Sequence, residues 1–194
     1  MRTVKPIFLF ADSQVLFWRE KEDGDLYIKC LRTIVESDEN RPEGPLKASY
    51  IGASNGDLQE YYDIFVSAMS QIDITECRMI PSSGITDDDY QFLRTSDIVL
   101  LAGGDIEKGW NVFAEGELHQ RIVDCYHNGA VLAGVSAGAI QLGLRGWKEP
   151  KEIPGDLFPT FQLVPAAIDV HDESDWDDLQ KIVKHLGETN RGFG

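Results

Sequence analysis

Residues 130–139 read AVLAGVSAGA, and this stretch is the most informative about the fold. Its first six residues, 130–135, are continuously apolar apart from Gly134, as expected for a strand of a parallel sheet that is buried on both faces. The small residues that follow allow the chain to turn sharply, and we expect a helix that begins at Ala137. A buried strand that turns directly into a helix is typical of α/β folds.

The chain on the N-terminal side of this stretch repeats the same alternation of apolar strands and amphipathic helices. We expect strands at residues 6–10, 47–53, 76–81 and 97–102. We expect helices at residues 25–35 and 58–72, after Thr86–Asp89, between Asp105 and Asn128-Gly129, and at 176–186. Together these elements predict a three-layer, doubly wound α/β domain with a mainly parallel, flavodoxin-like sheet. In such sheets ligands bind beyond the carboxyl ends of the strands.

Length and charge narrow the possible functions. The 194 residues suit one domain, 1–194, and 42% of them are hydrophobic, which sets disordered and low-complexity classes aside. With 18 basic and 33 acidic residues the net charge is −15, which argues against nucleic acid and anionic membrane surfaces as partners. Three cysteines without a CxxC pair indicate neither a disulfide framework nor a zinc site. We expect a cytoplasmic protein, because no apolar run approaches the roughly 20 residues that span a bilayer.

The turn after residues 130–135 carries the strongest chemical signal. Gly134-Val135-Ser136-Ala137-Gly138 fits G-x-S-x-G, a pattern in which a serine hydroxyl projects from a tight strand-to-helix turn as a nucleophile. The backbone N–H of Ala137, at the start of the helix, is then a candidate oxyanion donor. Gly103-Gly104 follows the fourth expected strand, and we expect Gly104 to supply the second donor.

A serine nucleophile needs a base, and four histidines are available. His171 follows the strand-like run 164–170, so it would emerge at the carboxyl end of a strand beside Ser136; it is our predicted general base. His119 and His127 fall on one expected helix with polar neighbours, and His185 lies on a late amphipathic helix. We expect these three to face solvent.

The acid that should orient the histidine is less well determined. Glu149, Glu152, Asp156 and Asp169 lie between Ser136 and His171. Asp169 is only two residues from His171 on one expected strand, a spacing that seldom gives the required geometry. The other three belong to a loop that could fold over the site. We favour Glu152, with Glu149 and Asp156 left open.

With these residues in place, the sequence resembles the serine peptidase family of dipeptidase E and cyanophycinase, whose fold is like that of class I glutamine amidotransferases. The matching segments are LLAGGD at 100–105, GVSAGA at 134–139 and LVPAAIDVH at 163–171. The resemblance implies a Ser-His-Glu/Asp hydrolase without metal or organic cofactor, acting on a small peptide through an acyl-enzyme. It also implies cleavage at aspartyl residues.

Two features depart from the family pattern. The segment after His171 reads DESDWDD, whereas recognition of a substrate carboxylate calls for a cation; Arg145, Lys148 and Lys151 are the basic residues nearby. An acidic rim suits an amino group or a basic side chain better. In addition, the sequence ends with Arg191-Gly192-Phe193-Gly194, a motif after which relatives continue into further strands, so we expect a domain shortened at its C-terminal end.

Three other functions are weaker fits. An α/β-hydrolase esterase shares the elbow, but the 58 residues that follow Ser136 are too few for its remaining βα units. An amidotransferase is disfavoured because its usual nucleophile is cysteine. The alternative from a different class is a non-catalytic binding or regulatory module on an amidotransferase-like fold. A small peptide is the expected partner, and a homodimer is the candidate assembly.

Overall fold

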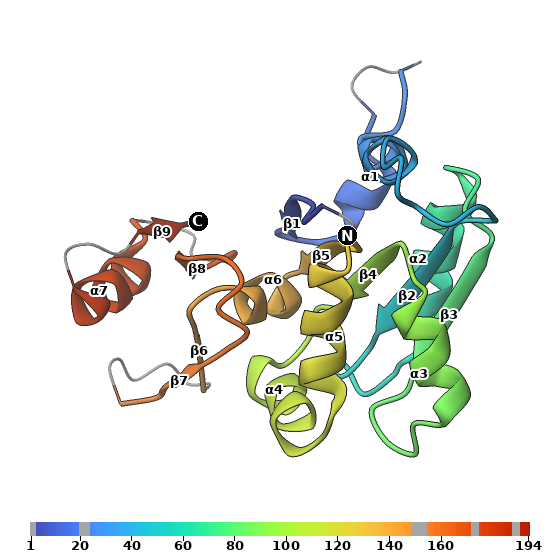
Figure 1. The fold of residues 1–194 in the computed structure, drawn as a ribbon. Helices are drawn as coiled ribbons and strands as arrows, with labels where there is room; N and C mark the ends of the chain where they lie inside the picture. Colours follow the sequence, from blue (N-terminus) through green and yellow to red (C-terminus); the bar gives the residue numbers. More distant parts are fainter. Residues whose placement is uncertain (1–2, 20–23, 149–154, 172–174, 188–190) are drawn as a thin grey trace.

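A computed structural model describes residues 3–19, 24–148, 155–171, 175–187 and 191–194, and Figure 1 shows its arrangement. The strands are β1 (Ile7–Phe10), β2 (Lys47–Ile51), β3 (Glu76–Ile80), β4 (Ile98–Leu101), β5 (Val131–Val135), β6 (Arg145–Trp147), β7 (Leu157–Pro159), β8 (Ala167–Ile168) and β9 (Gly192–Phe193). The helices are the 3-10 helix η1 (Ser13–Phe17) and the α-helices α1 (Lys29–Glu36), α2 (Gln59–Ser70), α3 (Asp87–Arg94), α4 (Ile106–Glu115), α5 (Leu118–His127), α6 (Ala137–Leu142) and α7 (Asp177–Leu186).

The main sheet is parallel and has the order β1-β5-β4-β2-β3. From β2 the chain crosses first to β3 on one side and then back past β2 to β4 on the other. The direction of winding therefore reverses between β2 and β4, and ligands bind at the carboxyl ends of strands at such a point. Ser54–Asp57 follows β2 there, and Gly103–Asp105, which contains the expected oxyanion donor Gly104, follows β4, so this part of the expected site lies at the switch point.

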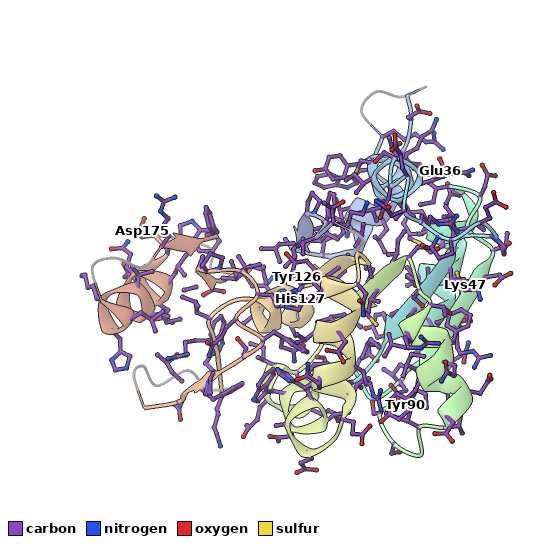
Figure 2. The ribbon with its side chains drawn as sticks, viewed as in Figure 1. Glu36, Lys47, Tyr90, Tyr126, His127 and Asp175 are labelled. Atoms are coloured by element: carbon purple, nitrogen blue, oxygen red, sulfur yellow. The ribbon has the colours of Figure 1, made fainter. Side chains whose placement is uncertain are left out.

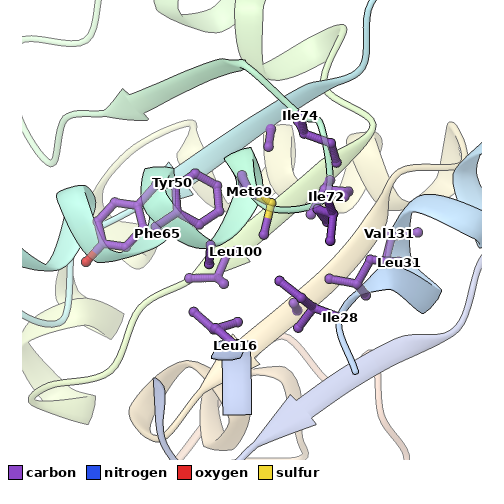
Figure 3. Packing of buried hydrophobic residues seen from close by; sticks show 14 of the residues in the cluster. Leu16, Ile28, Leu31, Tyr50, Phe65, Met69, Ile72, Ile74, Leu100 and Val131 are labelled. Atoms are coloured by element: carbon purple, nitrogen blue, oxygen red, sulfur yellow. The ribbon is translucent and has the colours of Figure 1, made fainter. Parts of the chain in front are cut away.

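Helices cover both faces of this sheet, which confirms the predicted three layers. On one face, α1 and α2 pack on alternate strand residues such as Tyr50 and Leu100 (Figure 3). On the other face, α3, α4 and α5 pack on the intervening residues, among them Ile51 and Leu101. Successive side chains of a strand point to opposite faces, so continuously apolar strands such as β4 and β5 supply both cores.

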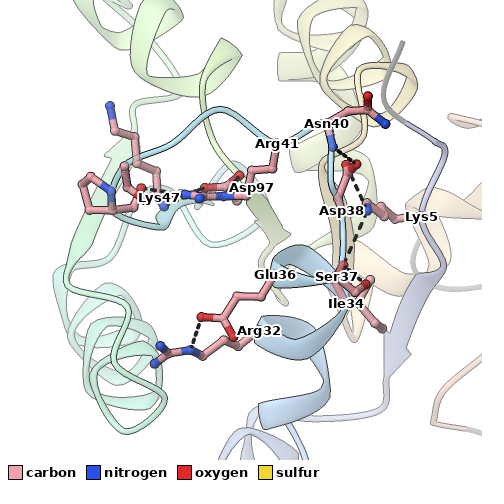
Figure 4. A network of polar contacts seen from close by, with 12 residues as sticks. Lys5, Arg32, Ile34, Glu36, Ser37, Asp38, Asn40, Arg41, Lys47 and Asp97 are labelled. Carbon is pink, nitrogen blue, oxygen red and sulfur yellow. Dashed lines mark hydrogen bonds and ion pairs between the residues drawn. The ribbon is translucent and has the colours of Figure 1, made fainter.

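The amino ends of the strands are joined by ion pairs (Figure 4). The buried carboxylate of Asp97, just before β4, contacts the Arg41 guanidinium at 3.0 Å and accepts the Lys47 backbone N–H at 3.1 Å. Lys5, before β1, pairs with the buried Asp38 at 3.1 Å. These contacts stabilise the end of the sheet opposite the switch point.

The C-terminal quarter of the chain forms a separate layer beyond α6 (Figure 1). Strands β6 and β7 form an antiparallel pair, and β8 and β9 form a two-residue parallel pair against which α7 packs. A third apolar cluster joins this layer to α6 through Ile140, Trp147, Ile168, Leu179 and Ile182.

Two expectations about the secondary structure need correction. The helical stretch expected up to Asn128-Gly129 is two helices, α4 and α5, interrupted at Gly116, whose φ of −131° is extended rather than helical. The strand expected at 164–170 is only the two residues of β8, and it pairs with β9 instead of joining the main sheet. Backbone pairing partners decide strand length, and hydropathy alone does not reveal them.

Candidate active site

Ser136 lies at the turn between β5 and α6, as predicted. Its backbone is in a strained region, with φ 51° and ψ −114°, and its N–H donates to the carbonyl oxygen of Phe10 at 2.8 Å. Two glycines permit this turn: a Cβ at Gly134 would lie 2.5 Å from the carbonyl oxygen of Gly138, and one at Gly138 would overlap that of Leu101. The G-x-S-x-G spacing is therefore required by close backbone packing around the serine.

His171 is the histidine that the fold brings to Ser136. Its Nε2 lies 2.7 Å from Ser136 Oγ, which is hydrogen-bond distance. The imidazole is exposed and Ser136 is half-buried, so the pair opens to solvent. His171 lies three residues beyond the end of β8, and thus reaches Ser136 from the small C-terminal sheet instead of from a long strand of the main sheet.

The other histidines lie elsewhere. His127 is exposed at the C-terminal end of α5, which leads into the start of β5 and therefore lies at the opposite end of the sheet (Figure 2). His185 is exposed on α7, as expected. The solvent-facing prediction is wrong for His119, which stacks on Phe161 with ring centroids 4.8 Å apart, and burial lowers its pKa.

The predicted acid, Glu152, and the alternative Glu149 lie outside the described residues. Asp156 is described and half-buried, but it lines neither of the cavities that meet at Ser136. Asp169 is buried, with 4% of its surface exposed, and lines a cavity together with His171. Its Oδ1 accepts the Val170 N–H at 2.9 Å.

Both expected oxyanion donors are next to Ser136. Ala137 is the first residue of α6, so its N–H precedes the hydrogen bonds within the helix. Gly104 follows β4 with φ +139°, and a Cβ there would overlap the carbonyl oxygen of Ser54. That carbonyl accepts the N–H of Asp105 at 2.8 Å, which holds the 103–105 turn against the turn after β2. Any residue with a side chain would displace this turn.

Asn55 contacts the turn that contains Gly104, although no sequence motif indicates it. Its Nδ2 donates to the Gly103 carbonyl oxygen at 3.2 Å and to the Tyr50 hydroxyl at 2.9 Å, while its Oδ1 accepts the Leu58 N–H at 3.2 Å. An amide can serve a carbonyl and an N–H at once. The signal was available, because Asn55 lies in a turn at the carboxyl end of β2, where ligands are expected.

A buried amide supports the same turns from beneath. Gln141 of α6 is fully buried; its Nε2 donates to Ser54 Oγ at 3.1 Å and to the Ile106 carbonyl oxygen at 2.9 Å. These contacts join α6, which carries the serine, to the turn after β2 and to the start of α4. The amide of Gln141 and the hydroxyl of Ser54 thus have hydrogen-bond partners where water is excluded.

Two cavities meet at Ser136 and His171, and Gly104 lines both. The first, of about 240 Å³, is mainly apolar and is lined by residues that include Leu16, Tyr50, Tyr61, Ile64, Phe65 and Leu100. The second, of about 340 Å³, is lined on its polar side by Asp105, Asp169 and Asp178. Ser136 is thus reached from two sides by groups of different chemistry.

Within the described ranges, no group of three or more His, Cys, Asp or Glu side chains could hold a metal ion. Cys125 is buried, and burial raises the pKa of its thiol to about 12; burial raises that of Cys77 to about 11. Neither cavity is lined by a cysteine. In the same part of the chain, no helix is long and apolar enough to cross a membrane.

The sequence of this chain matches the model of peptidase family S51 over residues 47–190, a range that includes Ser136 and His171. The chain belongs to peptidase family S51. Among curated proteins, this S51 member is 26% identical over 91 residues to the uncharacterized peptidase YgaJ of Bacillus subtilis (strain 168). That match covers 47% of this chain and 40% of the length of YgaJ.

Solved structures show the same fold. One is a peptidase from an acI-B1 Actinobacterium, with a TM-score of 0.67 and 15% identity over 91% of this chain and 74% of the other. A second is a peptidase E candidate from Listeria monocytogenes EGD-e, with a TM-score of 0.61 and 14% identity over 94% of this chain and 88% of the other. At these identities the likeness concerns the fold of the S51 member and not its substrate.

Proposed function

We propose that this S51 member is a serine peptidase that cleaves a small peptide through an acyl-enzyme. The observation that carries the proposal is the 2.7 Å contact between Ser136 Oγ and His171 Nε2 at a strained strand-to-helix turn. A base within hydrogen-bond distance is what a serine hydroxyl needs in order to act as a nucleophile. The family match supports the same class of reaction.

In the proposed reaction His171 accepts the proton of Ser136 as Oγ attacks the carbonyl carbon of the scissile bond. The N–H groups of Gly104 and Ala137 stabilise the resulting oxyanion. His171 then returns the proton to the leaving amine, and a water molecule activated by the same imidazole hydrolyses the ester on Ser136. Glu152 remains our predicted orienting acid for His171.

Asn55 acts in this scheme as a positioning residue. The carbonyl oxygen of Gly103 and the N–H of Gly104 belong to one planar peptide and point in opposite directions. By donating to that oxygen, Asn55 fixes the plane of the peptide and with it the direction of the Gly104 N–H. An oxyanion donor is effective only when it is aligned before the charge develops.

The proposal is tested by labelling the intact protein with an alkyl fluorophosphonate and mapping the adduct by peptide mass spectrometry. We expect one adduct on Ser136, and the Ser136→Ala variant should lose both the adduct and the hydrolysis of a dipeptide panel. Ser67→Ala, an exposed serine on α2, is the matched control and should behave as wild type. Labelling elsewhere, or none, would favour the non-catalytic binding module instead.

The remaining expectations from sequence stay predictions. The three cysteines, none of them in a disulfide, favour a reducing compartment, and the cytoplasm stays the predicted location. A homodimer stays the candidate assembly, and likeness to class I glutamine amidotransferases stays a resemblance of sequence motifs. The non-catalytic alternative is less favoured, because a binding module has no need of a strained serine beside a histidine.

A further inference from the structure

The first cavity offers a ring-lined recess directly beside the candidate nucleophile. Leu16 and Phe65 are buried at 2% and 1% exposure, whereas Tyr61 is 45% exposed at the rim. The Tyr50 and Phe65 rings pack with centroids 5.5 Å apart. Burial raises the pKa of Tyr50 to about 12, so its phenol is neutral at physiological pH. Aromatic and aliphatic walls of this kind bind apolar groups.

The size of the recess suits one side chain. Its volume of about 240 Å³ lies below the roughly 300–1,000 Å³ of sites that hold a whole drug-sized ligand. Gly103, Gly104 and Ser136 form the wall next to the reaction centre. An acyl group whose oxygen is held by the Gly104 N–H would therefore lie beside this cavity, which Gly104 and Ser136 line.

The charges around the recess oppose an acidic side chain. Among the described residues that line this cavity, Asp12 carries a charge and His171 is the one imidazole. No lysine or arginine is among them. Arg145 and Lys148, two of the cations considered from sequence, line neither cavity, and Lys148 pairs with Glu107 at 2.8 Å. Lys151 lies outside the described residues. A substrate carboxylate in this cavity would lose its hydration and would find no cation among the described lining residues.

We infer that this cavity binds an aromatic or large aliphatic side chain on the acyl residue of the substrate, and that the enzyme prefers such a residue to aspartate. This inference rests on the proposed function. It differs from the aspartyl preference implied by the family resemblance, because it follows from the lining of this chain's own cavity. The specificity-determining residues are Ile64 and Tyr61 of α2, together with Tyr50 and Phe65.

The test uses aminoalkyl diphenyl phosphonates, which acylation-competent serines attack, with benzyl, isobutyl, carboxymethyl or aminobutyl side chains. Second-order rate constants for labelling Ser136 are measured by intact mass. We expect the benzyl and isobutyl reagents to react about 100-fold faster than the carboxymethyl reagent. Equal or faster reaction of the carboxymethyl reagent overturns the inference. A preference for the aminobutyl reagent also overturns it, because the rings and Asp12 would then be binding a cation.

Variants on α2 locate the preference. Ile64→Ala should lower the ratio of benzyl to carboxymethyl rates about 10-fold, because Ile64 is half-buried against the cavity. Val66→Ala is the matched control: Val66 is also half-buried on α2 but packs on the core and does not line the cavity. The exposed Tyr61→Ser provides a second variant that leaves the core intact. An unchanged ratio in both cavity variants contradicts the inference.

The plain alkyl fluorophosphonate separates this inference from the proposed function. If it labels Ser136 but the phosphonate series shows no apolar preference, the hydrolase stands and the cavity assignment is wrong. If it does not label Ser136, the proposed function fails and the inference fails with it. A third experiment uses dipeptides that carry phenylalanine only on the leaving residue. If the enzyme prefers phenylalanine on the leaving residue and not on the acyl residue, the placement of the acyl side chain in this cavity is wrong.

Discussion

The two halves of the candidate site are built in different ways. Ser136 follows a five-residue strand that is fully buried and paired on both sides, and its N–H is held by Phe10 of β1. His171 follows a two-residue strand that pairs with the exposed β9, and its own ring is exposed. The candidate nucleophile therefore lies on a backbone with little freedom, whereas the position of the candidate base depends on a small peripheral layer.

This difference indicates where the site tolerates change. Around Ser136 the close contacts of Gly134 and Gly138 are with backbone atoms. These atoms cannot shift unless the strands of the sheet shift with them. At Gly192 of β9, in contrast, the nearest atoms to an added Cβ are side-chain atoms of Leu179 and Val183 of α7. We expect substitutions around Ser136 to lower both the free energy of unfolding and the activity. Around β8 and β9 we expect smaller losses, because neighbouring side chains can move.

The largest effect is expected for Gly138→Ala, compared with Gly192→Ala. A Cβ at Gly138 overlaps the Leu101 carbonyl oxygen, whereas one at Gly192 lies 2.9 Å from Val183 Cγ2 and 3.0 Å from Leu179 Cδ1. We expect the first to lower the free energy of unfolding by about 3 kcal/mol and the second by about 1 kcal/mol or less. Urea unfolding followed by circular dichroism measures both. Equal losses would contradict the proposed difference between the halves.

Asn55→Asp should have the next largest effect, and mainly on activity. The carboxylate keeps the acceptor for the Leu58 N–H but cannot donate to the Gly103 carbonyl oxygen. We expect kcat to fall about 10- to 100-fold with KM little changed, because only the transition state requires the aligned Gly104 N–H. Asn128→Asp, an exposed change after α5, is the control. An Asn55→Asp enzyme with wild-type kcat would show that Asn55 only caps the turn.

The smallest effect concerns His119, which stacks on Phe161 in the segment that connects β7 to β8. Because burial lowers its folded pKa below the ordinary value of 6.5, the folded state binds fewer protons. The contribution of His119 to the free energy of unfolding is present above pH 6.5 and is lost as the pH falls through the lower pKa of the folded state. His119→Phe should therefore lose less stability between pH 8 and pH 5 than wild type does. Equal losses in the two proteins would contradict the burial of a neutral His119.

The sequence reveals the two halves to different extents. The elbow at Ser136 is predictable because the strand, the glycine spacing and the turn all reflect one local packing requirement. The position of His171 beside Ser136 is also predictable, but the length of the strand before it is not, since β8 and β9 depend on a pairing between distant segments. The stacking of His119 and the lining of the apolar cavity also arise from tertiary contacts, which helical periodicity does not encode.

The central claim is that these two halves form one nucleophile–base pair, and the labelling rate of Ser136 by the alkyl fluorophosphonate tests it most directly. Wild type, His171→Ala and His185→Ala are compared at pH 8, with His185 as an exposed histidine of the same C-terminal layer. We predict a loss of at least about 1,000-fold for His171→Ala and no change for His185→Ala. Labelling of the His171→Ala variant at the wild-type rate would contradict the account.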